Sequence, residues 1–235
     1  MIEIPGRTGV FSFSPFGSAP LVLRRWAGEY GAQFGFTSPR PDRPGAFWDN
    51  HNQDAFRHGL VTGGVYLEMR QVLGNQPNFR DNASFIDESA ARRALGLGAM
   101  NESYRPNEVL KALRDYHNNY EGVILAREFA ALYGPNATND QWADFVAAQV
   151  QSDLHTIANG GTPRFILTDT DPRITPTAKR GEVDVYGNYD QNRLPAGPDG
   201  QGLVPNSAGL NPGVVRSFAD RYGPPPAASS PAPPS

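Results

Sequence analysis

The residues best suited to chemistry lie in the segment NHNQDAFRHG, at positions 50–59. If a helix begins just before Asp54, then Asp54, Arg57, His58 and Thr62 fall at i, i+3, i+4 and i+8, on one face. A carboxylate one turn before a histidine can accept the proton of its ring and fix its tautomer. Arg57 offers a planar, two-pronged donor that suits a phosphate or a carboxylate. Asn50, at the start of the segment, is a candidate substrate-binding residue.

A second unusual segment, DYHNNYEG, occupies positions 115–122. Two asparagines and a glycine are poor helix formers, so helix propensity does not explain their presence in an otherwise helical stretch. His117 and Glu121 are one turn apart and can share a face. Asn118 and Asn119 are candidate donors to a substrate oxyanion, and Glu121 is a further candidate for substrate binding.

Small residues connect the two segments. The first carries them at i, i+4 and i+8, at positions Ala55, Gly59 and Gly63, and the second carries Gly122. A glycine inside a helix costs about 1 kcal/mol relative to alanine, so close approach of another helix is a physical reason to keep it. We therefore expect the two helices to pack through these residues and to bring His58 and His117 toward a common cleft.

The residue types suit the hydrolysis of a phosphate-containing substrate. Arg57 would neutralise the phosphoryl oxygens, one histidine would act as general acid or nucleophile and the other as base, and Asp54 would orient His58. A metal version of this site stays open, in which His58, His117 and either Asp54 or Glu121 bind zinc or another divalent ion. Neither segment contains a local zinc signature such as HExxH, so the sequence requires no cofactor.

In this order, the two segments resemble a largely uncharacterised family of toxin-associated domains. Its members carry N-x-x-x-D-A-F-R-H and D-[LY]-H-N-N-x-x-G and occur at the C-termini of bacterial Rhs-like, wall-associated and other polymorphic toxin proteins. The resemblance covers roughly residues 47–130. It departs from the family after His58, where no aromatic-rich continuation follows, and after Gly122, where Val123 replaces a frequent arginine.

The resemblance implies an antibacterial toxin or secreted effector. The positions that it carries over are Asp54, Arg57, His58, His117, Asn118 and Asn119. Such a toxin needs a cognate immunity protein and secretion machinery, and a lipid-linked peptidoglycan precursor or a phospholipid in the cell envelope would suit a phosphate hydrolase. Two alternatives stay open: a non-catalytic interaction or delivery-adaptor module, and a histidine-based nuclease toxin.

Composition and charge narrow these alternatives. The chain has 21 basic and 24 acidic residues, which gives a net charge of −3, and no Lys/Arg stripe favours nucleic acid as a partner. It has no cysteine, which excludes disulfides, thiolate zinc sites and cysteine nucleophiles. The opening MIEIP has no basic region and later apolar residues are interrupted by proline and glycine, so we expect delivery without an N-terminal signal peptide. Such a toxin would be cytoplasmic in the producer and act in the envelope of a target cell.

Helical periodicity predicts the elements that hold these segments. We expect a mainly α fold built on three longer helices over residues 53–73, 106–133 and 138–158, with a shorter helix over 87–95 that stops at Gly96 and Gly98. Residues 164–168 and 182–186 read as short strands, possible partners in a late β-hairpin.

Glycine and proline together make up 47 of 235 residues, about one in five against about 12% on average, so much of the chain is loop or tail. We expect an irregular N-terminal wrap over 1–45, one helical domain over 46–190, and a Gly/Pro-rich extension with a disordered tail over 191–235.

Overall fold

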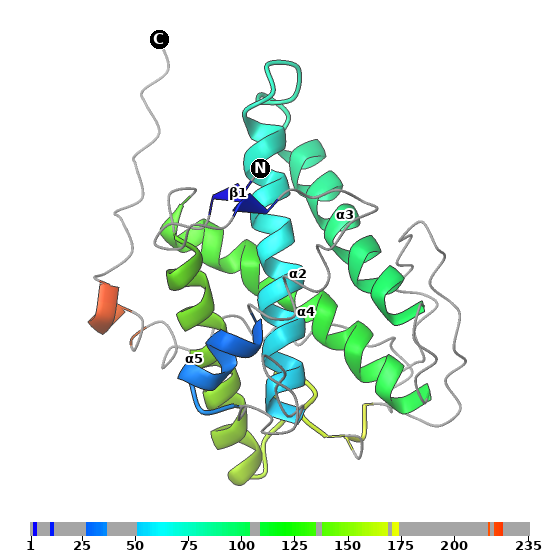
Figure 1. The fold of residues 1–235 in the computed structure, drawn as a ribbon, viewed down its shortest axis with the longest axis vertical. Helices are drawn as coiled ribbons and strands as arrows, with labels where there is room; N and C mark the ends of the chain where they lie inside the picture. The colour runs from blue at the N-terminus through cyan, green and yellow to red at the C-terminus, as the bar shows by residue number, and fades with distance from the viewer. Residues whose placement is uncertain are drawn as a thin grey trace.

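The computed structural model describes residues 2–3, 10–11, 27–36, 51–103, 109–134, 138–168, 171–173, 216 and 219–222. Most of these residues are helical, which confirms the predicted mainly α class (Figure 1). The long helices are α2 (His51–Gly74), α3 (Ala83–Ser103), α4 (Val109–Tyr133) and α5 (Asn139–Ala158). Strands β1 (Ile2–Glu3) and β2 (Val10–Phe11) form one antiparallel pair, with Ile2 opposite Phe11. None of the described helices is long and apolar enough to cross a membrane.

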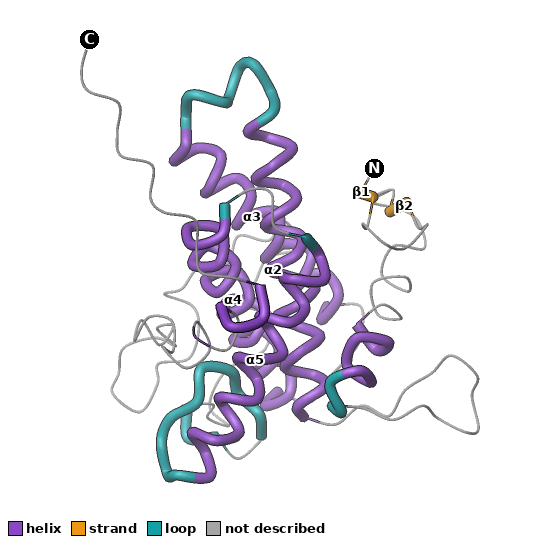
Figure 2. The backbone as a smooth tube through the Cα atoms, turned by 90° about the vertical axis from the view of Figure 1, so that its left-hand side faces the viewer, coloured by secondary structure: helices purple, strands orange, loops and turns teal. Residues whose placement is uncertain are grey.

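Helix α2 is the centre of the fold, because it contacts α3, α4 and α5 (Figure 1). The turn that joins α2 to α3 lies at one end of the molecule, and the opposite half of α2 holds the first candidate segment (Figure 2). Between the helices lies an aromatic core whose largest fully buried members are Trp142, Tyr66, Phe56, Phe129, Phe145 and Phe165. The indole nitrogen of Trp142 donates to the Leu60 carbonyl at 3.0 Å, so this large side chain is buried without an unsatisfied donor.

The predicted close contact between α2 and α4 is confirmed. A Cβ atom on Gly122 would lie 2.9 Å from the Gly59 Cα and 3.0 Å from the Gly59 carbonyl oxygen, so neither backbone leaves room for a side chain. A Cβ atom on Gly63 would lie 2.6 Å from the Gly122 carbonyl oxygen and 2.3 Å from the Trp142 ring. The small residues therefore set the distance between the two helices that carry the candidate segments.

Helix α5 begins and ends as its sequence predicts. Thr138 and Gln141 form a capping box, in which the Thr138 hydroxyl accepts from the Gln141 amide and the Gln141 side chain accepts from the Thr138 amide. Gly160 follows the helix at a φ of 73°, a left-handed conformation that glycine adopts without strain. Both ends of this helix are therefore set by local side-chain and backbone chemistry.

Two of the expected elements are wrong in detail. Helix α3 does not stop at Gly96 and Gly98 but continues to Ser103, because glycine lowers helix stability without ending a helix that has a tertiary partner. Residues 164–168 form no strand, since their backbone groups bond to side chains of α4 and α5 instead of to a neighbouring strand. Residues 182–186, most of the N-terminal wrap and most of the extension lie outside the described residues.

Candidate functional site

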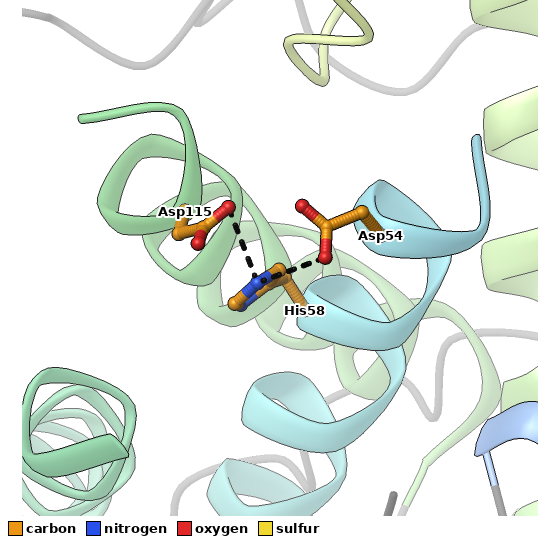
Figure 3. A group of neighbouring side chains, drawn as sticks. All are labelled: Asp54, His58 and Asp115. Carbon is orange, nitrogen blue, oxygen red and sulfur yellow. Dashed lines mark ion pairs between the residues drawn. The ribbon is translucent and has the colours of Figure 1, made fainter. Parts of the chain in front are cut away.

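Asp54 and His58 of α2 meet Asp115 of α4 at the centre of the candidate site. Figure 3 shows the His58 ring between the two carboxylates, one from its own helix and one from the helix that crosses it. Its Nε2 lies 3.4 Å from Oδ1 of Asp115 and 3.7 Å from Oδ1 of Asp54. All three side chains are buried, at 5% exposure or less. The sequence prediction that Asp54 orients His58 is consistent with this geometry, and Asp115 is a second carboxylate that it did not assign to the site.

Two arginines complete the charged cluster. Arg57 forms an ion pair with Asp54, and Arg114 Nη2 lies 2.6 Å from the other Asp54 oxygen. Burial opposes ionisation of Asp54, but the charges of Arg57, His58 and Arg114 outweigh it and hold the pKa of this carboxyl well below its usual range. Arg114 also lies 3.4 Å from Oδ1 of Asp115. We call these five residues, Asp54, Arg57, His58, Arg114 and Asp115, the charged cluster.

The other nitrogen of His58 is fixed by a side-chain amide. Its Nδ1 lies 2.8 Å from Oδ1 of Asn119, and the same oxygen accepts from the Thr62 hydroxyl at 2.7 Å. Nδ1 thus faces an acceptor, whereas Nε2 lies between Arg57 Nη2, at 3.3 Å, and the Asp115 carboxylate, at 3.4 Å. Burial works against the charged ring, yet Asp115 and Asp54 raise the pKa of His58 to about 9. His58 is therefore protonated at neutral pH and suits the role of a proton donor.

His117 lies in a different environment, so the prediction of paired imidazoles is not supported. Its Nε2 bonds to the backbone carbonyl of Arg164 at 3.0 Å, and its neighbours are Arg164, Arg173 and Asp171. None of these residues contacts His58 among the interactions of the described residues. Burial and the nearby charge of Arg173 lower the pKa of His117 to about 4, so this ring is neutral where His58 is charged.

The helical period explains this separation. On an α-helix, residues two apart point in nearly opposite directions, so Asp115 and His117 cannot face the same neighbour. Gly122 is seven residues after Asp115 and shares its face, whereas it is five residues after His117 and does not. The contact through Gly122 therefore turns Asp115 and Asn119 toward α2 and turns His117 away from it.

Like His117, the side chains of Asn118 and Glu121 contact residues 164–166. The amide group of Asn118 makes two bonds to Ile166, accepting from its N–H at 2.8 Å and donating to its carbonyl at 3.0 Å. Glu121 is fully buried and pairs with Arg164 at 2.9 Å. The Asn118 amide thus bonds to the backbone through both its nitrogen and its oxygen, which conflicts with its predicted role at an oxyanion.

The segment that these side chains hold, residues 163–167, is buried throughout, and we call it the strap. Asp153 of α5 fixes its other side by accepting from the backbone N–H groups of Arg164 and Phe165, at 3.0 and 2.8 Å. Burial raises the pKa of Asp153 to about 6 in spite of these bonds. Arg173 donates to the carbonyls of Pro163 and Arg164 at 2.9 and 3.2 Å. His117, Asn118 and Glu121 therefore have structural partners in the strap.

The predicted metal set is not gathered in one place, since His117 and Glu121 contact the strap while Asp54 and His58 lie in the charged cluster. A different set comes closer, because donor atoms of Asp54, His58 and Asp115 all lie within 4.8 Å of one another. However, Arg57 and Arg114 already bind Asp54, and a metal-bound histidine must be neutral. The charge of the cluster therefore fits a divalent cation poorly.

Two residues of the site, Arg114 and Asp115, were given no role in the sequence analysis, whereas Thr62 was placed on the same helix face as Asp54 and His58. Asp115 and Asn119 are one turn apart, so the face that includes Gly122 identifies both. Arg114 carries no such signal, because its partner Asp54 is 60 residues away in the chain. Asn50, a predicted substrate-binding residue, lies outside the described residues.

Comparison of the chain with protein-family models, curated proteins and solved structures finds no match.

Proposed function

We propose that this chain is an antibacterial toxin or secreted effector domain that hydrolyses a phosphate-containing substrate of the cell envelope. Its substrate class would be a lipid-linked peptidoglycan precursor or a phospholipid, and its partners would be a cognate immunity protein and the machinery that secretes it. The toxin context rests on the resemblance of the two sequence segments, and the hydrolase chemistry rests on the charged cluster.

The observation that carries the proposal is the charge state that the cluster imposes. With His58 protonated, the cluster contains three positive groups, Arg57, Arg114 and His58, and two negative ones, Asp54 and Asp115. Guanidinium and imidazolium groups donate charge-assisted hydrogen bonds to anionic oxygens, so three such groups in one cluster favour an anionic ligand. Phosphate is an anion that arginine binds with good geometry, and it is the group that a hydrolase of this class must recognise.

Arg57 is the member of the cluster that best fits initial contact with substrate. Its side chain is 16% exposed, whereas those of Asp54, His58, Arg114 and Asp115 are at 5% or less. Arg57 Nη2 also lies 3.3 Å from His58 Nε2. A phosphoryl group on Arg57 would thus lie near Nε2, from which a proton could pass to the departing oxygen as water attacks phosphorus. The proton that the attacking water releases would return to Nε2 through solvent and restore the protonated ring.

These roles revise the predicted mechanism to one histidine. His58 acts as general acid instead of nucleophile, because a protonated imidazole has no free electron pair. Asp54 and Asp115 hold its charge and orientation, and Arg114 positions Asp54. His117 contributes through the strap and has no direct part in the chemistry.

The test is toxicity in a bacterium, with the chain expressed either in the cytoplasm or with export to the periplasm. We expect killing only on export, and we expect the His58→Gln variant to abolish it together with phosphate release from envelope lipids. His155→Gln is the matched control, since His155 lies exposed on α5. A His58→Gln variant that folds and kills as well as the parent chain would remove the hydrolase proposal.

A second candidate, a non-catalytic interaction or delivery-adaptor module, is favoured by one observation. Both His58 and His117 are buried, at 5% and 2% exposure, as structural histidines are. An adaptor would kill in neither compartment and release no phosphate. Its His58→Gln variant would lose stability while no catalytic readout changed, so the same experiment separates the two candidates.

A further inference from the structure

The side-chain amide of Asn119 is hydrogen-bonded at its oxygen but, among the described residues, not at its nitrogen. Oδ1 faces the Thr62 hydroxyl and His58 Nδ1, at 2.7 and 2.8 Å. Nδ2 is buried and has no hydrogen-bond partner in the part of the chain that the structure describes, although the whole residue is only 3% exposed. A buried donor without a partner destabilises a fold, so its presence needs an explanation such as a ligand.

A 180° rotation of the Asn119 amide group would not remove the unsatisfied atom. With its oxygen and nitrogen exchanged, the NH₂ group would face the Nδ1–H of the protonated His58 ring, and the oxygen would become the unpartnered atom. Asp115 and Asp54 lie 3.4 and 3.7 Å from Nε2 of this ring, and both carboxylates favour its protonated form. The charged cluster thus fixes the direction in which Nδ2 points.

Nδ2 points at a glycine of α3. A Cβ atom on Gly98 would lie 2.7 Å from Nδ2 and 2.9 Å from Cγ of Asn119, so a side chain there would displace the amide. Gly98 is inside a helix, where glycine is unfavourable, and its lack of a side chain lets the α3 backbone pack directly against the Asn119 amide.

We propose that Asn119 Nδ2 donates a hydrogen bond to an anionic oxygen of the substrate, and that Gly98, which has no side chain, leaves the amide in its place for this contact. The proposal rests on the proposed function, whose phosphate-bearing substrate supplies the oxygen. Of the two asparagines that the sequence predicted for this role, the proposal assigns it to Asn119, because the Asn118 amide bonds to the backbone of Ile166. Asn119 is then a residue that both positions His58 and binds the substrate.

The experiment is a titration of the whole chain with inorganic phosphate, followed by NMR of the Asn119 side-chain NH₂ and of the His58 ring. We expect phosphate to shift both sets of signals with one dissociation constant. Gly98→Ala should weaken phosphate binding at least tenfold, because its methyl group would displace the Asn119 amide. Gly64→Ala is the matched control, because its methyl group would meet only Trp142, at 3.6 Å, and phosphate binding should not change.

The outcomes separate this inference from the proposed function. If phosphate shifts the His58 ring and leaves the Asn119 NH₂ signals unmoved, the cluster binds anions and the role of Asn119 is wrong. Unchanged phosphate affinity in a folded Gly98→Ala variant overturns the role of Gly98. Absence of any phosphate-induced shift overturns the inference, and the toxicity assay then decides whether the hydrolase proposal falls with it. Should Gly98→Ala not fold, the NMR signals of the parent chain decide alone.

Discussion

Two polar networks lie on different faces of α4, and each buries one histidine. His58 lies in the charged cluster, between the carboxylates of Asp54 and Asp115 (Figure 3). His117 lies against the strap, bonded to a backbone carbonyl and facing Arg173. Both rings are almost fully buried, yet the pKa of His58 rises to about 9 and that of His117 falls to about 4.

The difference teaches that burial alone does not set the charge of a histidine. Desolvation disfavours the charged ring at both positions, and the outcome depends on the neighbours. Two carboxylates reverse the effect at His58, whereas the arginine beside His117 adds to it. A charged buried histidine is suited to transferring a proton, and a neutral one that bonds to backbone is suited to holding a segment in place.

The largest expected effect comes from breaking the charged cluster at Asp54. Asp54→Asn removes the carboxylate shared by Arg57, His58 and Arg114, and we expect a loss of about 3–5 kcal/mol in the free energy of unfolding. The pKa of His58 should fall at the same time. Urea denaturation measures the first effect and NMR titration of the ring measures the second. Asp81→Asn is the control, because Asp81 is 90% exposed and its loss should change neither quantity.

The next effect is a pH dependence that separates the two histidines. The folded pKa of His58 lies above its ordinary value of 6.5, so its stabilisation is complete below about pH 6.5 and is lost as pH rises through about 9. We expect a loss on the order of 3 kcal/mol across this window. The pKa of His117 is lowered to about 4, so the contribution of this neutral ring to the free energy of unfolding is present above pH 6.5 and is lost as the pH falls toward 4.

The measurement is the difference in unfolding free energy between the parent chain and His58→Gln, taken at several pH values from 6 to 9.5. This difference removes the contributions of other titrating groups, including Asp153. A parallel pH dependence in the two proteins would show that His58 is neutral in the fold and that the charge comparison is wrong.

The smallest and sharpest test uses two neighbouring asparagines that face the two networks. Asn118→Ala should cost about 2 kcal/mol, because it leaves the N–H and carbonyl of Ile166 without partners, and it should leave the pKa of His58 unchanged. Asn119→Ala should lower the pKa of His58, because the ring loses the acceptor for Nδ1–H. Urea denaturation and NMR titration of both variants check this. A shift of the His58 pKa in Asn118→Ala would show that the networks are coupled.

The sequence predicted most of the helical framework and part of the site. Capping residues and apolar periodicity placed α2, α4 and α5, because both are local signals that act within one or two turns. The i, i+3, i+4 spacing correctly placed Arg57 and His58 beside Asp54. The strand prediction for residues 164–168 was wrong, since an apolar run of that length fits a strand as well as a buried irregular segment.

By itself, the sequence determined which residues share a helix face and that two helices must approach through glycine. Only the tertiary structure decided which partner each polar side chain receives: Asp115 and Arg114 for the charged cluster, and the strap for His117, Asn118 and Glu121. The physical reason is that a histidine's charge and role follow from groups within a few ångströms. In this chain, several of those groups come from positions 47 to 61 residues away.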